Sequence, residues 1–219
     1  MKRLALLAAL AALVSTGTQA QTRGLPVPTE RVESMQRLAV EAWTACIADE
    51  FKGRVHEVLM LDFRSREYAR KLERLAEERI SERCFDAMPR NYRRIELNGL
   101  PFAGGLAEQA MKNASDEPLL TRLSMAAIGK QAPVFSYTDQ VANCAVRGAP
   151  HLVAALFESD VASVEEEDAL EQLAPVYMVC TQRGSAIEAS PLAMRSMLAT
   201  ASYRLLASQD STEESEPDA

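Results

Sequence analysis

The feature that most constrains the fold is a pattern of cysteines that occurs twice. The four cysteines form two successive pairs, with separations of 38 (84 − 46) and 36 (180 − 144) residues: Cys46 with Cys84, and Cys144 with Cys180. Within each pair a serine, Ser65 or Ser163, precedes a charged helical pattern that becomes apolar and ends at the second cysteine. This repetition predicts a tandem duplication of one small multi-helix unit.

The first twenty residues predict a secretory signal peptide. Lys2 and Arg3 give a positive start, an apolar run extends from Leu4 to Val14, and Thr18 and Ala20 place small residues at positions −3 and −1 of a cleavage site. The run is shorter than the roughly 20 residues of a membrane-spanning helix. We therefore expect cleavage near Ala20 and a periplasmic or secreted protein with no transmembrane segment in the mature chain.

The charge of the chain excludes some partners. The formal net charge of −7 becomes −9 once Lys2 and Arg3 leave with the signal peptide. Residues 208–219 carry acidic residues and no basic one, which predicts a disordered acidic tail. An acidic body disfavours nonspecific binding of nucleic acid or anionic lipid, so no nucleic-acid partner is expected.

Four cysteines in an exported chain favour disulfide bonds. Three pairings are possible, and the duplication favours Cys46–Cys84 and Cys144–Cys180 because each copy then closes its own bridge. Zinc is the alternative for four cysteines. No two of them have the short spacing of a local zinc clip, so we expect no metal and no cofactor.

Apolar residues recur at steps of three and four along most of the mature chain, which predicts an all-α fold. We expect two helical repeats, residues 21–113 and 114–207, with Asn113–Pro118 as the boundary. Expected helices run from Thr29 to Gly53 and from Ser65 to Cys84, with short apolar turns near 55–61 and 150–157. Residues 92 apart match between the repeats: Ile95-Glu96 with Ile187-Glu188, and Leu106-Ala107 with Leu198-Ala199.

Several local features carry their own predictions. Gly104 and Gly105 lie inside an expected helix, where glycine is unfavourable, so another backbone should pack against them. Ser163 and Glu166 fit a capping box, and the acidic run 165–168 suits a helix N-terminus better than a metal site. Pro175 predicts a kink or break. The methionines 178, 194 and 197 are expected to fill the core.

Motifs of familiar catalytic sites are missing from the sequence. It contains no G-x-S-x-G, H-E-x-x-H, P-loop or G-x-G-x-x-G pattern. Its two histidines, His56 and His151, do not fall at equivalent positions of the repeats, and we interpret them as structural. Arginines 90, 93 and 94 would suit an anion but are interpreted as a solvated loop. We expect a protein that is not an enzyme.

Two segments resemble a family of exported, internally duplicated helical proteins of unknown function from alpha-proteobacteria. The first is Leu170 through Cys180 with the glycine that follows; the second runs from Met194-Arg195 through Ala199 to Tyr203-Arg204. Leu75–Cys84 and Gly105–Met111 form the weaker counterpart in the first repeat. The resemblance implies an exported helical fold and no catalytic residue.

Three hypotheses for function follow. The first is a non-catalytic binding or interaction protein of the bacterial envelope, which uses a groove between the repeats or the charged face from Arg66 to Arg83. The second is a carrier of a small apolar ligand, which a closed apolar cavity lined by Met194, Met197 and Leu198 would favour. The third is a hydrolase, which would need two carboxylates that converge in a cleft. The partner, whether protein or small molecule, is not identified by the sequence.

Overall fold

The protein is all-α in the part of the chain that the structure describes. The structure, a computed structural model, describes residues 29–77, 80–93, 98–181 and 187–213. The signal peptide and residues 214–219 of the predicted tail lie outside these ranges. The described helices are α1 (Thr29–Glu50), α2 (Lys52–Met60), α3 (Arg66–Ala76), α4 (Glu82–Ala87), α5 (Gly99–Lys112), α6 (Leu119–Ile128), α7 (Tyr137–Gly148), α8 (Pro150–Glu158), α9 (Val164–Cys180) and α10 (Pro191–Glu213).

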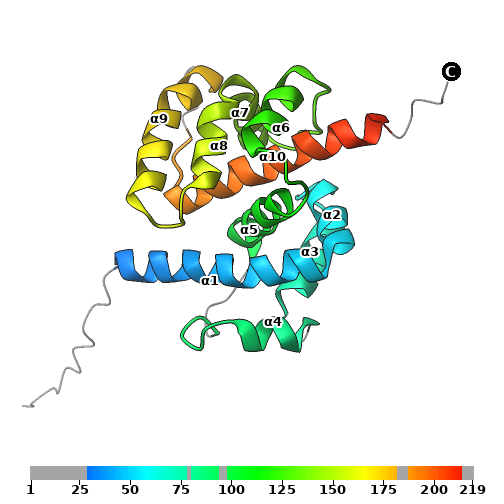
Figure 1. The fold of residues 1–219 in the computed structure, drawn as a ribbon, viewed down its shortest axis with the longest axis vertical. Helices are drawn as coiled ribbons and strands as arrows, with labels where there is room; N and C mark the ends of the chain where they lie inside the picture. Colours follow the sequence, from blue (N-terminus) through cyan, green and yellow to red (C-terminus); the bar gives the residue numbers. More distant parts are fainter. Residues whose placement is uncertain (1–28, 78–79, 94–97, 182–186, 214–219) are drawn as a thin grey trace, which may run out of the picture.

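Helices α5 and α10 form the centre of the fold. They pack along one another, and α5 lies between α1 and α10 (Figure 1). Helices α6 to α9 gather on the other side of α10, while α2 to α4 lie near α1 and α5 (Figure 1). Buried apolar side chains from both halves, among them Trp43, Phe102 and Phe157, form one continuous core. The two halves of the chain therefore share their interior.

Both disulfides have the predicted pairing. Cys46 bonds Cys84 and Cys144 bonds Cys180, with Cα–Cα distances of 5.5 and 5.8 Å. The first joins the end of α1 to α4, and the second joins α7 to the last residue of α9. Each bridge therefore closes a loop within its own half of the chain.

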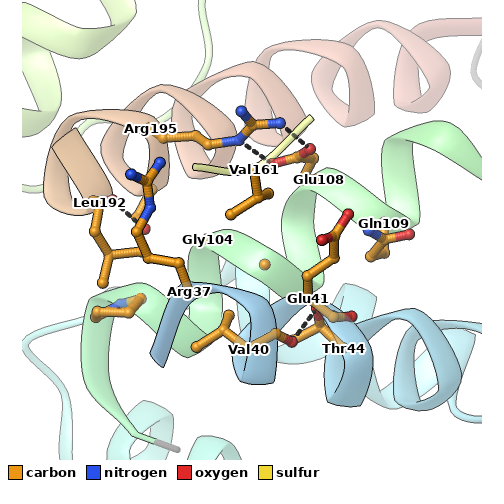
Figure 2. A pocket seen from close by; sticks show the side chains of 13 residues that line it. Arg37, Val40, Glu41, Thr44, Gly104, Glu108, Gln109, Val161, Leu192 and Arg195 are labelled. Atoms are coloured by element: carbon orange, nitrogen blue, oxygen red, sulfur yellow. Dashed lines mark hydrogen bonds and ion pairs between the residues drawn. The ribbon is translucent and has the colours of Figure 1, made fainter. Parts of the chain in front are cut away.

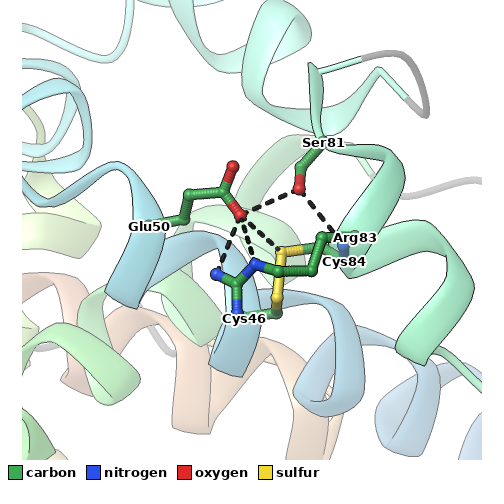
Figure 3. The surroundings of a disulfide bond; sticks show 5 residues. All are labelled: Cys46, Glu50, Ser81, Arg83 and Cys84. Carbon is green, nitrogen blue, oxygen red and sulfur yellow. Dashed lines mark hydrogen bonds and ion pairs between the residues drawn. A yellow bond between two sulfur atoms is a disulfide. The ribbon is translucent and has the colours of Figure 1, made fainter.

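The carboxylate of Glu50 lies beside the first disulfide and binds its polar neighbours (Figure 3). Its carboxylate accepts hydrogen bonds from Ser81 Oγ at 2.9 Å and from Arg83 Nη2 at 2.9 Å. One sulfur and carboxylate cluster, formed by Cys46, Glu50 and Cys84, is compact enough for a metal ion. Both sulfurs are bonded to each other, so neither is the thiolate that zinc requires. The cluster is a buttressed disulfide.

The predicted helix from Ser65 to Cys84 is two helices. Ser65 caps α3 as expected, because its Oγ accepts a hydrogen bond from the Tyr68 amide at 3.1 Å. Helix α3 ends at Ala76, and Ser81 caps a separate α4 that carries Cys84. Helix α4 holds Cys84 at the end of α1, where Cys46 lies 5.5 Å away between Cα atoms.

Other helix ends also differ from the sequence prediction. Helix α1 stops at Glu50 and α2 begins at Lys52, so Gly53 lies inside a helix instead of ending one. The predicted apolar turns at 55–61 and 150–157 are the helices α2 and α8. Pro175 lies within α9, which continues to Cys180. Helix α10 extends to Glu213 and so includes residues 208–213 of the predicted tail; within this part, Gln209 Nε2 donates to the Lys130 carbonyl at 2.8 Å.

Gly104 marks the place where α5 and α10 meet. A Cβ at Gly104 would lie 2.5 Å from Ser196 Cα, closer than packed atoms approach. A Cβ at Gly105 would lie 2.7 Å from a methyl group of Val40 on α1. The predicted close approach of another backbone is confirmed at Gly104, whereas Gly105 is approached by side chains of α1.

The halves share local structure at a spacing of 98 residues before α5 and α10, and of 92 residues within these two helices. Ser65 and Ser163 cap α3 and α9 in the same way, and each accepts a bond from the amide three residues on. The backbone bonds Val55 to Phe51 and Val153 to Ala149 follow the same spacing. Gly104 and Ser196, which meet at the helix crossing, are 92 apart. The tandem duplication and its boundaries stay predictions that agree with these spacings.

Among the described helices, none combines the length and the hydropathy needed to cross a bilayer.

Candidate functional site

Two clefts lie along α5 and α10, and each is lined by residues from both halves of the chain. The first, which we call the Glu41 cleft, is bordered by α1, α5 and α10, with Val161 from the loop before α9 (Figure 2). The second, the Tyr68 cleft, is bordered by α3, α5, α7 and α10, with Phe63 from the loop before α3. The groove between the halves that the sequence suggested thus has two counterparts.

Arg195 fills one end of the Glu41 cleft. Its guanidinium binds Glu108 in a bidentate manner, with Nε to Oε2 at 2.8 Å and Nη2 to Oε1 at 2.6 Å (Figure 2). Its Nη1 donates to Glu166 at 2.8 Å, and Nη2 also donates to the Ser159 carbonyl at 3.1 Å. All three charged side chains are buried. Arg195 therefore ties α10 to α5 and to α9.

Glu166 extends this network to the first helix. Its carboxylate accepts a hydrogen bond from Arg37 Nη2 on α1 and another from the Ala162 amide at 2.9 Å. Ala162 adopts a positive φ of 62°, which aims its N–H back at that carboxylate. The Ser163 cap of α9 is present, but the Glu166 side chain does not close a capping box. It is a buried partner of two arginines instead.

The pKa values of the two carboxyls in the Glu41 cleft are shifted in opposite directions. Burial would raise the pKa of Glu108, but hydrogen bonds and charge from Arg195, joined by Lys112, outweigh it and lower that pKa. Burial raises the pKa of Glu41 above its ordinary value of 4.5, although Lys112 acts against the rise. Burial acts to lower the pKa of Arg195, and its bonds and charge contacts with Glu108 and Glu166 raise it overall.

The Glu41 cleft has almost no free space. Its cavity measures about 30 Å³, which is room for one or two water molecules. Arg37 Nε is buried without a hydrogen-bond partner among the described residues, so a water there would satisfy it. Glu41 and Glu108 do converge in one cleft, as a hydrolase would need. Glu108, however, is held by Arg195 and Lys112.

The Tyr68 cleft is larger and mostly apolar. Its cavity measures about 250 Å³. Apolar walls come from the loop before α3, the start of α5 and the middle of α10: Phe63, Leu100 and Met197. Tyr68 adds an aromatic face with a hydroxyl, and burial raises the pKa of that phenol. This combination of apolar walls with few polar groups is typical of small-molecule sites.

One buried ion pair forms the polar end of the Tyr68 cleft. Arg204 on α10 pairs with Asp139 in the first turn of α7, and both side chains are almost fully buried. The other carboxylate oxygen of Asp139 accepts the Phe135 amide at 3.0 Å. The guanidinium also lies over the Phe135 ring, 5.5 Å from its centroid. Both carboxylate oxygens of Asp139 are thus engaged.

The two clefts are built from corresponding positions. Twelve of their residues form six pairs at a spacing of 98, or of 92 within α5 and α10: Val40 with Thr138, Glu41 with Asp139, Phe63 with Val161, Leu100 with Leu192, Gly105 with Met197, and Glu108 with Thr200. Arg204 likewise corresponds to Lys112, and Tyr68 to Glu166. Positions that the predicted duplication would pair thus line both clefts, one of them filled by charged side chains and the other with an open cavity.

Comparisons of the chain with protein-family models, with curated proteins and with solved structures found no match. No family is assigned. The functional reading of the two clefts therefore depends on their own chemistry.

The remaining candidates from the sequence lie elsewhere. Met194 packs against the core and Met197 lines the Tyr68 cleft, but Met178 is 72% exposed, so its prediction as core filler is wrong. The closed cavity that would favour a carrier was expected to be lined by Met194, Met197 and Leu198, and of these only Met197 lines the Tyr68 cleft. Arg93 stacks on Phe85 and binds the Met88 carbonyl at 3.1 Å, which is a structural role. Arg94 lies outside the described residues.

His56 has a partner that the sequence did not indicate. Its Nδ1 lies 2.9 Å from the Tyr203 hydroxyl, at the edge of a hollow of about 380 Å³ that Lys52 and Arg122 also line. His56 is exposed, so a ligand group there would compete with water. The charged face of α3 holds ion pairs of Lys71 with Glu57 and Glu67. Neither feature has the buried polar groups of the Tyr68 cleft.

Proposed function

We propose that the protein is a non-catalytic binding protein of the bacterial envelope, and that it holds a small, mostly apolar molecule in the Tyr68 cleft. One observation carries the proposal: a cavity of about 250 Å³ has apolar walls and a buried Arg204–Asp139 pair at one end. The two disulfides and the predicted signal peptide support export. An acidic chain supports a partner other than nucleic acid.

The rigid surroundings of the cleft support binding without catalysis. Its charged groups are paired with each other, and catalytic sites of familiar classes need an acid, base or nucleophile that is free to react. All four cysteines are in disulfides, so none is a nucleophile. A preformed pocket loses little conformational freedom when it binds a ligand, which favours affinity.

A probe of matching size tests this function. We expect 3-phenylpropanamide, with an apolar body and one neutral polar end, to bind the oxidised mature protein saturably at one site in calorimetric titration. Met197→Trp should abolish the binding because the larger ring fills the cavity. Met178→Trp makes the same replacement at an exposed position and should leave binding unchanged. Binding that Met197→Trp does not alter would place the site elsewhere and overturn the proposal.

A carboxylate-based hydrolase is the second candidate, and the Glu41 cleft favours it. Glu41 and Glu108 line one cleft with pKa values shifted apart, an arrangement that acid–base pairs share. Its cavity of about 30 Å³ leaves no room for a sugar or ester. Turnover of a chromogenic glycoside or ester panel that Glu41→Gln abolishes would establish this alternative in place of the first.

A further inference from the structure

The Tyr68 cleft has a size that restricts its ligand. An enclosed apolar cavity of about 150 Å³ accepts benzene. At about 250 Å³ the Tyr68 cleft accepts a molecule of roughly ten non-hydrogen atoms by the same scale. Phe63, Leu100 and Met197 line it, so most of that molecule must be apolar to gain from leaving water. Its polar part must then lie at the end where Arg204 is found.

Comparison with the Glu41 cleft shows which side chain lies next to the cationic residue at this position, Lys112 on α5 or Arg204 on α10. There Lys112 occupies the position that corresponds to Arg204, and its ammonium donates a hydrogen bond at 2.8 Å to the carboxylate of Glu108, one turn earlier. In the Tyr68 cleft the position one turn earlier is Thr200, a short neutral side chain. One carboxylate that the first cleft supplies from its own chain is therefore missing from the second. The open cavity lies where it would be.

The charges of the Tyr68 cleft permit an added carboxylate. Asp139 neutralises Arg204, but Asp139 also lies in the first turn of α7, where the helix N-terminus carries partial positive charge. The corresponding Glu41 lies in the middle of α1 and has no such compensation; Arg195 and Lys112 act on it instead. Arg204 keeps donors beyond the Nη2 that binds Asp139, and the protonated phenol of Tyr68 is a further donor.

We propose that the Tyr68 cleft binds a compact apolar carboxylate, whose acid group lies against Arg204 and Tyr68 in the place that Glu108 takes in the Glu41 cleft. This inference rests on the proposed function and names its ligand class. The ligand is a monocarboxylic acid with an aryl or short alkyl body of roughly ten non-hydrogen atoms. The shared framework thus has one cleft with a built-in acid and one that takes its acid from solution.

Four probes with one skeleton separate the ligand class from the binding site. We expect 3-phenylpropanoate to bind the oxidised mature protein about tenfold more tightly than 3-phenylpropanamide, because a charge-assisted bond to a guanidinium is stronger than a neutral one. 3-Phenylpropylamine should bind more weakly than the amide, since its ammonium group faces Arg204. Propylbenzene reports the apolar walls alone.

A variant that supplies the missing acid gives a second test. Thr200→Glu places a carboxylate four residues before Arg204, as Glu108 lies before Lys112. Thr200→Gln adds nearly the same volume without charge and is its matched control. Relative to Thr200→Gln, Thr200→Glu should weaken the binding of 3-phenylpropanoate about tenfold and leave the binding of 3-phenylpropanamide unchanged.

The possible outcomes are distinct. If amide, amine and hydrocarbon bind as tightly as the acid, and Met197→Trp still abolishes binding, the acid class is wrong while the proposed function stands. If none of the four probes binds saturably, both the acid class and the proposed function are wrong. Equal losses of acid and amide affinity in Thr200→Glu and Thr200→Gln would show that volume alone acts, and would overturn the assignment of the acid to Arg204.

Discussion

In the Glu41 cleft, position 108 holds a glutamate and position 195 an arginine; the corresponding positions in the other half hold Thr200 and Ala103. These two differences decide whether the framework holds its halves together or leaves a cavity. Arg195 reaches across to Glu108 and Glu166, and its cleft has room for water only. The Tyr68 cleft lacks those groups and has a cavity of about 250 Å³. Both clefts are lined by residues from the two halves, yet one is a structural lock and the other is a candidate binding site.

The largest effect that would test this contrast is the loss of Arg195. Arg195→Met removes the buried partner that Glu108 and Glu166 share and leaves Lys112 with the first and Arg37 with the second, and breaking such a buried network costs about 3–5 kcal/mol. Chemical denaturation should show that loss at pH 7. Arg64→Met breaks a solvent-exposed pair with Asp62, which solvent screens, and should have a much smaller effect. Similar losses in the two variants would mean that the Glu41 cleft is not the lock.

The disulfides should contribute nearly equally, unlike the clefts. They close separations of 38 and 36 residues, and each removes about 4 kcal/mol of loop-closure entropy from the unfolded chain. The double variants Cys46→Ala/Cys84→Ala and Cys144→Ala/Cys180→Ala should therefore lose similar unfolding free energy in denaturant titrations. A loss confined to one pair would show that the halves also differ in their scaffolding.

The sequence predicted those features that depend on local patterns. Helical periodicity gave the all-α fold, and the exported context with repeated spacing gave the disulfide pairing. The ends of α3 and α4 were missed, because Ser81 looked like part of one charged helix, and its role as a cap depends on Cys84 returning to Cys46. Local propensity does not contain that constraint.

The residues of the clefts could not be predicted from the sequence because they lie far apart along the chain. Arg37 and Glu166 are 129 residues apart, and each alone reads as a solvated helix charge. One signal was present: Arg195 and Glu108 lie on apolar helix faces, one in register with Leu198 and the other beside Met111. A charge inside an apolar stripe predicts a buried partner, although it does not say which one.

A smaller effect comes from the crossing that both clefts share. Gly104→Ala places a methyl group 2.5 Å from Ser196 Cα, so α5 and α10 must separate. We expect a net loss of about 1–3 kcal/mol from overpacking, with a change in both clefts that a crystal structure of the variant would show. Gly53→Ala is the control, because nothing lies within 4 Å of its added Cβ and it gains helix propensity. Destabilisation by the control alone would contradict the crossing geometry.

The smallest effect is a pH dependence that belongs to the Glu41 cleft alone. Burial raises the pKa of Glu41 above 4.5, so the folded state binds its proton more tightly than the unfolded state does. Stability from this group therefore increases as the pH falls from 7 through the raised pKa toward 4.5. Glu108 has a lowered pKa and acts oppositely, but its contribution is lost only below 4.5, in a separate window.

Glu41→Gln should remove the gain between pH 7 and 5, which we expect to be under about 1 kcal/mol because the half-buried carboxyl is screened by solvent. Glu158→Gln, an exposed carboxyl on α8, should keep the gain. Denaturant titrations at pH 5 and 7 measure it, and a gain that persists in Glu41→Gln would mean that another group, and not the closed cleft, responds to pH.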